Sequence, residues 1–305
     1  MRRGPAVRSA LLRLFLLLLP LLYGCATLPY DYPRTLSTAL YLPEATAMGK
    51  KIQPQVAEHQ GASGFYLLSS GEDAFLARVR LIDRAEKTLD LQYYLFSPDL
   101  TGKYMLDRIV AAAERGVRVR LLLDDWDETA EMDRWLAMME IYSSIEVRIF
   151  NPFGGLRLNP VTRSLGAVFG AKRLQGRMHN KAFIVDNSVA IVGGRNIADQ
   201  YFGASNDFNF RDIDIMAEGP IVRQVSSAFD DYWNCVLSIP LKALVSRRPT
   251  ADEIQRARRD LEAEREALKK SSYEVKVPRS ASNPTIASGG KIMTQRLSPA
   301  PTANS

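Results

Sequence analysis

The sequence has 305 residues, of which 46% are hydrophobic and 24% charged, a composition typical of globular proteins with a sizeable buried core. The formal net charge is +6, but four arginines and no acidic residues fall within the first 24 positions. Removing these four charges from +6 leaves +2 for the rest of the chain. A nearly neutral body lacks the basic surface that binds the phosphates of nucleic acids. We therefore expect no nucleic-acid partner.

The N-terminal segment has the three parts of a secretory signal peptide, which we place at residues 1–24. A positively charged region ends at Arg13, and an apolar run follows from Leu14 to Leu22, interrupted only by Pro20. This run is too short to cross a bilayer, whose hydrocarbon core requires about 20 apolar residues. The segment is therefore expected to direct export rather than to span a membrane.

The end of this segment is similar to the lipobox of bacterial lipoproteins. Gly24 directly precedes Cys25, and Leu22 lies three positions before the cysteine. The resemblance implies that the thiol of Cys25 carries the lipid; the alternative is a plain signal peptide with an incidental cysteine. By the sorting rule of such lipoproteins, Ala26 favours the outer membrane, with the protein facing the periplasm. Residues 25–61, rich in Pro, Thr and Ala, are expected to form an extended tether.

Residues 62–245 are expected to form an α/β domain, because strand and helix patterns alternate along the chain. FYLLSS is a candidate strand, and the apolar residues of FLARVRLI recur at helical spacing. LDLQYYLF alternates like a half-buried strand, YMLDRIVAAAERG ends at Gly116 as helices often do, and VRVRLLLDD has a strand pattern. This order predicts a mostly parallel or mixed sheet with helices on its faces.

The following residues continue the same alternation. EMDRWLAMMEIYSS is predicted to be a helix and IEVRIFNPF a strand, whereas residues 154–175 are expected to be loop with some helix. Two strands, Met178–Val185 and Val189–Val192, are predicted to be joined across Asp186 and Asn187, a common hairpin pair. RDIDIMAEG has the pattern of a further strand, and IVRQVSSAFDDYWNCVLS that of a helix.

The C-terminal part changes in character. Residues 246–272 are dense in charges of both signs and are expected to form a solvated helix. In residues 273–305 Ser, Pro, Thr and Asn dominate without apolar periodicity, which predicts a disordered tail.

The most informative segment contains His179 and Lys181, followed by Gly193, Gly194 and Asn196. Side chains two residues apart on a strand share a face, so the imidazole and the ammonium are expected to lie together. The second hairpin strand can bring the two glycines alongside, where a ligand could approach the backbone. Asn196 would donate its amide protons to the same space. A nucleophile, a cation and neutral donors around one space suit a phosphodiester.

The pattern H-x-K-x4-D, formed by His179, Lys181 and Asp186, and the following GGRN resemble the signature of the phospholipase D superfamily. RGVRVRLLLDD, RMHNKAFIVDNSVAIVGGRNIADQYF and RDIDIMAEGP extend the likeness over about residues 62–240. Together they are similar to the N-terminal half of bacterial cardiolipin synthases of the lipoprotein type. The resemblance implies a phospholipase D-like half-domain that requires no metal or other cofactor.

The resemblance also implies roles for the residues of the motif. In this family one histidine attacks phosphorus to give a phosphohistidine, while a second protonates the departing alcohol and then activates the incoming one. His179 fills one of these places. Lys181 and Asn196, with the backbone at Gly193 and Gly194, would bind the phosphate.

Two carboxylates are implied to support this chemistry. Asp186 would organise the hairpin turn rather than touch substrate. Asp212 would orient the partner histidine, and Asp214 is the competitor for that role. Asp124 and Asp125 follow a strand, and we expect them to cap a helix or hold a loop rather than bind a metal.

The chain lacks a second H-x-K-x4-D, which the two-motif members of the superfamily carry. Its histidines are His59 and His179, and His59 has no lysine two places on, so we do not expect it to be catalytic. Either the sequence is a truncated half-enzyme, or two copies pair about a two-fold axis as a homodimer, each supplying one His, Lys and Asn.

Three functions follow from these observations. The first is a phosphatidyltransferase or phospholipase D acting on membrane phospholipids through a phosphohistidine, as in cardiolipin synthesis. The second is a single-motif endonuclease acting as a homodimer, against which the nearly neutral charge argues. The third is a catalytically inactive lipoprotein fragment that only binds lipid head groups or a partner.

Overall fold

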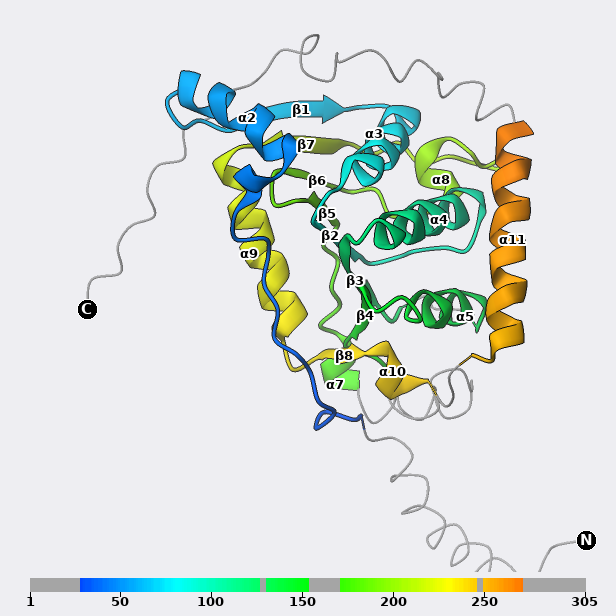
Figure 1. The fold of residues 1–305 in the computed structure, drawn as a ribbon. Coiled ribbons are helices and arrows are strands. Elements are labelled where there is room, and N and C mark those ends of the chain that lie inside the picture. Colours follow the sequence, from blue (N-terminus) through cyan, green and yellow to red (C-terminus); the bar gives the residue numbers. More distant parts are fainter. Residues whose placement is uncertain (1–27, 127–129, 154–170, 246–248, 271–305) are drawn as a thin grey trace, which may run out of the picture.

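The described residues, 28–126, 130–153, 171–245 and 249–270, form an eight-stranded sheet in the computed structural model (Figure 1). From one edge to the other the strand order is β1-β7-β6-β5-β2-β3-β4-β8. The strands are β1 (Gly64–Leu68), β2 (Thr88–Tyr93), β3 (Arg118–Asp124), β4 (Ile145–Phe150), β5 (Ala182–Val185), β6 (Val189–Gly193), β7 (Asp214–Glu218) and β8 (Ser238–Pro240).

Parallel pairing is confined to β2 with β3 and β3 with β4. Each of the other neighbouring strand pairs is antiparallel. Although β1 and β2 are successive strands, β7 and the hairpin β6–β5 lie between them, so β1 pairs with β7 at the edge. The expected α/β fold with a mixed sheet is confirmed, but the sheet is not mostly parallel, because β5 to β7 enter it as antiparallel strands.

Helices cover both faces of this sheet (Figure 1). Because successive side chains of a strand point to opposite faces, Leu121 of β3 packs in the cluster below α3, α4 and α5, and Leu122 packs in the cluster below α9. Burial of these two apolar clusters is the main favourable contribution to folding. The helices are η1 (Pro43–Ala45), α2 (Ala47–Glu58), α3 (Gly71–Arg84), α4 (Leu100–Glu114), α5 (Ala130–Met139), α7 (Ala171–Leu174), α8 (Asp199–Phe202), α9 (Pro220–Asn234), α10 (Leu241–Leu244) and α11 (Ala251–Lys270).

Local capping explains where the central helices begin and end. The hydroxyl of Ser70 accepts a hydrogen bond from the backbone N of Asp73 at 3.0 Å, which caps α3. Asp99 caps α4 in the same way through the backbone N of Gly102, at 3.0 Å. After α4 the chain turns at Gly116, whose φ of +90° lies in the region that favours glycine.

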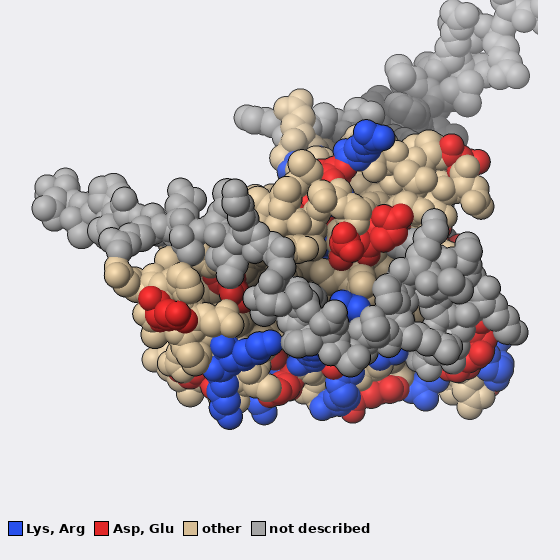
Figure 2. Space-filling model, turned by 90° about the horizontal axis from the view of Figure 1, so that it is seen from above, with Lys and Arg blue, Asp and Glu red and all other residues tan. Residues whose placement is uncertain are grey.

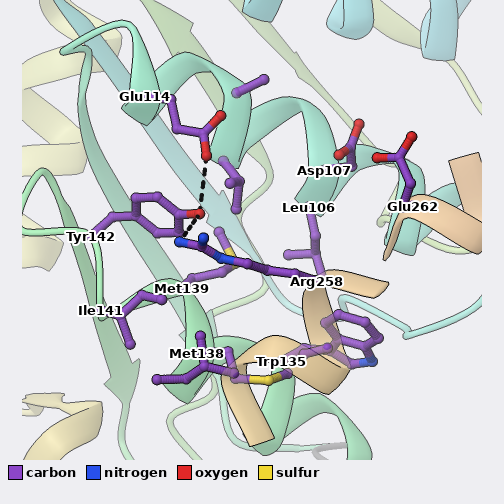
Figure 3. A pocket seen from close by; sticks show the side chains of 14 residues that line it. Leu106, Asp107, Glu114, Trp135, Met138, Met139, Ile141, Tyr142, Arg258 and Glu262 are labelled. Atoms are coloured by element: carbon purple, nitrogen blue, oxygen red, sulfur yellow. Dashed lines mark hydrogen bonds between the residues drawn. The ribbon is translucent and has the colours of Figure 1, made fainter. Parts of the chain in front are cut away.

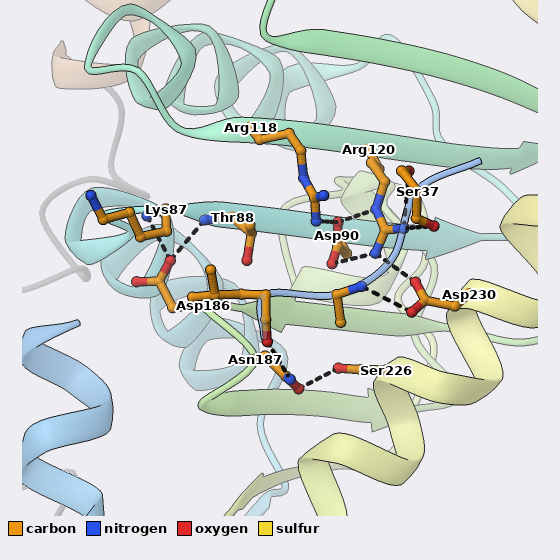
Figure 4. A network of polar contacts seen from close by, with 12 residues as sticks. Ser37, Lys87, Thr88, Asp90, Arg118, Arg120, Asp186, Asn187, Ser226 and Asp230 are labelled. Atoms are coloured by element: carbon orange, nitrogen blue, oxygen red, sulfur yellow. Dashed lines mark hydrogen bonds and ion pairs between the residues drawn. The ribbon is translucent and has the colours of Figure 1, made fainter. Parts of the chain in front are cut away.

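The segment before β1 is not the extended tether expected for residues 25–61, because it contains helix α2 and contacts β3 and α9 (Figure 4). Arg120 of β3 is buried between two carboxylates, with Nε 2.6 Å from Asp90 Oδ1 and Nη2 2.8 Å from Asp230 Oδ1. Its Nη1 donates to the carbonyl oxygen of Ser37 at 2.9 Å. A buried guanidinium needs acceptors for its N–H groups, and the N-terminal segment supplies one.

The charged segment expected over residues 246–272 forms α11, but this helix is not solvated on all sides. It packs across α4 and α5 and forms with them a pocket of about 240 Å³ that is open to solvent on one side (Figure 3). Arg258 of α11 donates to the hydroxyl of Tyr142 at 3.0 Å, and this hydroxyl donates to Glu114 Oε1 at 3.1 Å. Ala257 of α11 is buried next to these hydrogen-bonded side chains. One side of this mostly charged helix therefore packs against α4 and α5.

Several expectations fall outside the described residues. They concern the signal peptide at 1–24, the lipid attachment at Cys25, the loop at 154–170 and the disordered tail at 273–305. Among the helices that the structure does describe, none combines the length and apolar character needed to cross a bilayer.

Candidate active site

His179 and Lys181 lie side by side just before β5. The Nζ atom of Lys181 is 3.1 Å from His179 Nδ1 and donates to the carbonyl oxygen of His179 at 2.7 Å. The predicted strand from Met178 was wrong at this end, since β5 begins only at Ala182. Strand pleating therefore does not align the two side chains. They meet because the buried lysine folds back onto the exposed histidine.

Tyr94 contacts both residues of the histidine–lysine pair. The sequence pattern did not indicate this tyrosine. Its ring centroid is 4.8 Å from that of His179, and Lys181 Nζ lies 5.3 Å from the centre of the same ring. The second contact is a cation–π interaction, which favours the charged ammonium. Tyr94 directly follows β2, the neighbour of β5 in the sheet, and that adjacency cannot be deduced from the sequence pattern alone.

The pKa values of both motif side chains are displaced. Partial burial, followed by the positive charge of Lys181, lowers the pKa of His179 below its ordinary value. A lowered pKa keeps the imidazole neutral near pH 7, the form with a lone pair for attack on phosphorus. Burial lowers the pKa of Lys181, while the carboxylates of Asp212 and Asp124 oppose this effect.

Asn196 is fixed at the same end of the sheet. Its Oδ1 accepts from the backbone N of Leu95 at 3.1 Å, and its Nδ2 donates to the hydroxyl of Tyr201 at 3.0 Å. Leu95 follows Tyr94, the ring that contacts His179. Phosphate binding by this amide stays a prediction, and Tyr201 is an additional residue that holds the side chain in place.

Gly193 and Gly194 are required by close packing against the protein itself. A Cβ at Gly193 would lie 2.1 Å from Asp214 Oδ1, and one at Gly194 would lie 2.2 Å from Asp212 Oδ1. The space left by the missing side chains therefore holds carboxylates, instead of the open room for a ligand that we had expected. Phosphate binding by this backbone, like the orientation of a partner histidine by Asp212, stays a prediction.

Asp214, the competitor of Asp212, has a structural position. It is wholly buried, with Oδ2 2.9 Å from Arg78 Nη2 and 3.5 Å from Arg195 Nη1. Arg78 is buried as well, and its Nε donates to the hydroxyl of Tyr93 at 3.0 Å. This network joins α3 to β7 beneath the site.

Asp186, the acidic member of the motif, lies at the other end of β5 from Lys181. Its carboxylate accepts from the backbone N atoms of Glu86 (3.0 Å), Lys87 (2.7 Å) and Thr88 (2.8 Å) (Figure 4). Its φ of +52° is the left-handed conformation that Asp and Asn tolerate in hairpin turns. Asp186 therefore fixes the turn and the start of β2 and does not reach the histidine–lysine pair.

Asp124 holds the loop that carries His179, in agreement with the expected loop role. It ends β3, and its Oδ2 accepts from the backbone N of Met178 at 2.9 Å. Its Oδ1 is 3.3 Å from Nη1 of Arg177. Asp125, the next residue, accepts from the backbone N of Phe153 at 2.6 Å. Asp124 therefore positions His179 through the backbone of the preceding residue, Met178.

The titration of Asp124 gives a prediction for stability. Burial, the largest influence, raises the pKa of Asp124 from 3.8 to about 6, against the opposing effect of Arg177. The folded protein therefore binds this proton more tightly than the unfolded chain, so the contribution of Asp124 to wild-type stability improves as the pH falls from about 6 to about 4. Asp124→Asn has no titrating group there. The free energies of unfolding of wild type and Asp124→Asn are measured in urea across this pH range. As the pH falls from about 6 to about 4, the difference should shift in favour of wild type. A difference that stays constant would contradict the raised pKa of Asp124.

No group of three or more His, Cys, Asp or Glu residues that could hold a metal ion occurs within the described ranges. On the face seen in Figure 2, basic and acidic side chains are intermixed along the lower margin and form no continuous basic field. His59 follows α2, and its Nδ1 contacts the carbonyl oxygen of Gln55 at 2.8 Å.

Comparison with known proteins identifies the family. The family model described as cardiolipin synthase, PLD-like domain, matches residues 79–233. The chain is 44% identical over 210 residues to cardiolipin synthase C of Escherichia coli (strain K12), covering 68% of this chain and 43% of that protein. It is 29% identical over 170 residues to the major cardiolipin synthase ClsA of Bacillus subtilis (strain 168), covering 55% and 32%.

Two solved structures are also similar, with TM-scores below 0.5. Nuc from Salmonella typhimurium, a phospholipase D family member, has a TM-score of 0.41 and 18% identity over 58% of this chain and 97% of that one. Phosphatidylserine synthase from Haemophilus influenzae Rd KW20 has a TM-score of 0.44 and 15% identity, covering 73% and 48%.

The chain is thus a phospholipase D-like protein by its motif and its family match. It belongs to the cardiolipin synthase PLD-like domain family. At family level this places it among phospholipase D-like phosphodiesterases and phosphatidyltransferases. The chain spans less than half the length of three curated relatives to which it is 44%, 36% and 34% identical over the aligned residues, covering 43%, 46% and 48% of them.

Proposed function

We propose that this chain supplies one half of a two-histidine centre that transfers phosphatidyl groups between phospholipids, or from phospholipids to water. The observation that carries this proposal is the 3.1 Å contact between Lys181 Nζ and His179 Nδ1, which supports a role for the imidazole as nucleophile and for the ammonium as a phosphate-binding cation. Membership in the cardiolipin synthase PLD-like family supports a phospholipid as the substrate. The nearly neutral body of the chain argues against nucleic acid.

The reaction would proceed in two displacements. A neutral His179 attacks phosphorus and forms an N–P bond while the bond from phosphorus to the leaving alcohol breaks. A second histidine gives a proton to that alcohol and then removes one from the incoming alcohol or water, whose oxygen displaces the imidazole. Lys181 and a proton of Asn196 Nδ2 hold the non-bridging oxygens, where negative charge develops.

Lys181 would also control the proton position on the imidazole. While the ammonium donates to Nδ1, a neutral ring carries its own proton on Nε2. When a phosphate oxygen accepts from Lys181 instead, the ring proton can occupy Nδ1, and the Nε2 lone pair becomes available. Substrate binding would thereby activate His179.

The second histidine must come from outside the histidine–lysine pair of this chain. His59 is unsuited, because Gly64, shortly after it, pairs with Glu218 at the end of β7 opposite to Asp214. We propose that a second copy of the chain supplies its own His179, so that the centre forms between two chains. A homologous second half, either continuous with this sequence or on another polypeptide, is the alternative source.

Lipid turnover and oligomeric state, measured over one range of protein concentration, test this proposal. With phosphatidylglycerol vesicles, we expect cardiolipin and glycerol as products, at a rate per chain that rises with the dimer fraction found by analytical ultracentrifugation. A constant rate per chain under conditions where monomers dominate would exclude a shared centre. Cleavage of plasmid DNA without any change in the phospholipid would mean that the substrate class is wrong.

A further inference from the structure

An ordered loop connects α8 to β7 beside the active site. Within residues 203–213, the backbone N of Ser205 donates to Asn209 Oδ1 at 3.2 Å, and Asn209 Nδ2 donates to the carbonyl oxygen of Ser205 at 2.9 Å. The backbone N of Phe210 donates to the carbonyl oxygen of Gln200 at 2.8 Å. These bonds close the loop on itself and tie it to α8, so its side chains are presented from a fixed backbone.

This loop exposes apolar side chains to water. Phe208, Phe210 and Ile213 are 56%, 50% and 55% exposed. The two phenyl rings pack edge to face, with centroids 5.2 Å apart and an angle of 79° between the planes. Exposed apolar groups gathered on one ordered element are typical of interaction surfaces, because burying them elsewhere is favourable.

The exposed rings are connected to the phosphate-binding residues by a single side chain. The ring of Phe210 lies 4.9 Å from that of Tyr201, whose hydroxyl accepts from Asn196 Nδ2 at 3.0 Å. Only the side chain of Tyr201 therefore lies between the exposed ring of Phe210 and the amide of Asn196, which is expected to hold a phosphate oxygen. In a phospholipid the acyl chains are joined to the phosphate through glycerol, so they must lie within a short reach of that amide.

We propose that Phe208 and Phe210 insert into the surface of the bilayer, at the boundary between head groups and acyl chains, beside the phospholipid whose phosphate lies at His179. This inference rests on the proposed function and deepens it: the substrate is taken from a bilayer rather than as a dispersed phosphodiester. Aromatic side chains favour this boundary. The charges of the loop are mixed, with Asp207 and Asp212 beside Arg211, so insertion should depend on apolar contact and only weakly on salt.

Depth-dependent fluorescence quenching tests the insertion directly. The full chain is prepared as Phe208→Trp and, as the matched control, as Tyr41→Trp. Tyr41 is 89% exposed, and its neighbour Leu40 accepts from Asn187 in the hairpin turn, at the opposite end of the sheet from His179. On vesicles whose acyl chains carry bromine, Phe208→Trp should gain quenching over unbrominated vesicles, and Tyr41→Trp should not. Both variants carry His179→Ala, so the result is independent of turnover.

The ratio of turnover on vesicles to turnover on dispersed short-chain phospholipid provides the second readout. Phe208→Ser should lower this ratio by about tenfold, the factor expected when one phenyl side chain loses part of its apolar burial. Phe208→Trp, with His179 intact, should restore the ratio, and Tyr41→Ser should leave it unchanged.

Three outcomes would change the account in different ways. Equal quenching of the two tryptophan variants would overturn the inference. The loop would instead be an interface between chains under two joint results. In the absence of vesicles, the indole introduced by Phe208→Trp would become shielded from water as the protein concentration rises. On brominated vesicles, the same indole would not be quenched. Absence of turnover on either substrate, with quenching intact, would contradict the proposed function only.

Discussion

Replacement of His179 by alanine is expected to abolish turnover of phospholipid vesicles while the chain stays folded. The loss should be on the order of 10⁴-fold or more, because in the proposed mechanism the variant lacks the nucleophile and cannot form the covalent intermediate. His179 is exposed, so its removal leaves no large cavity in the core. Initial rates with labelled phosphatidylglycerol, together with thermal unfolding of the same preparations, measure both parts of this expectation.

His59→Ala is the matched control, since it removes the other histidine of the chain. His59 is exposed, and its ring contacts the carbonyl oxygen of Gln55 in its own helix. Turnover by His59→Ala should equal that of wild type within about twofold, because single surface changes usually alter stability little. If His179→Ala kept a tenth or more of the wild-type rate, the imidazole at that position would not be the nucleophile.

The second large effect is expected on stability, at the buried ion pairs of Asp214. Replacement of Asp214 by alanine leaves the guanidinium groups of Arg78 and Arg195 buried without their carboxylate, at positions now 2.9 and 3.5 Å from it. Removing one partner of a buried pair typically costs about 3–5 kcal/mol. Urea unfolding should show a loss of this size, with an unchanged dependence on urea concentration if the native fold is retained.

An exposed ion pair provides the comparison. Arg108 Nη2 lies 2.8 Å from Asp83 Oδ1, and the two side chains are 25% and 44% exposed, whereas those of the Asp214 pairs are 2% exposed or less. Asp83→Ala should therefore cost no more than about 1 kcal/mol. Similar losses in Asp83→Ala and Asp214→Ala would show that burial does not determine the contribution of these pairs.

Local patterns in the sequence were sufficient for the main elements and for the chemistry of the motif. The hairpin across Asp186 and Asn187 was predicted from residue preference, because few other residues adopt a positive φ easily. The proximity of His179 and Lys181 was also correct, although its cause was not. We expected strand pleating, whereas the contact arises from the lysine folding back before β5 begins.

The partners of the supporting residues could not be predicted, since they come from distant parts of the chain. Asp124 binds the backbone of Met178, which lies 54 residues later, and Tyr94 reaches His179 only because β2 and β5 are neighbours. The same is true of the N-terminal segment. Its composition predicted a tether, but the carbonyl oxygen of Ser37 accepts a hydrogen bond from buried Arg120 in β3, and this contact holds the segment against the domain.

Chemical trapping can detect the proposed covalent intermediate on His179. Wild-type chain is mixed with phosphatidylglycerol, quenched within the first turnover at alkaline pH, where a phosphohistidine survives, and digested for tandem mass spectrometry. The account predicts a phosphatidyl adduct on the peptide that contains His179, lost on acid treatment and absent from His179→Ala. Turnover with the adduct on a different residue, or with no adduct under conditions that preserve phosphohistidine, would contradict it.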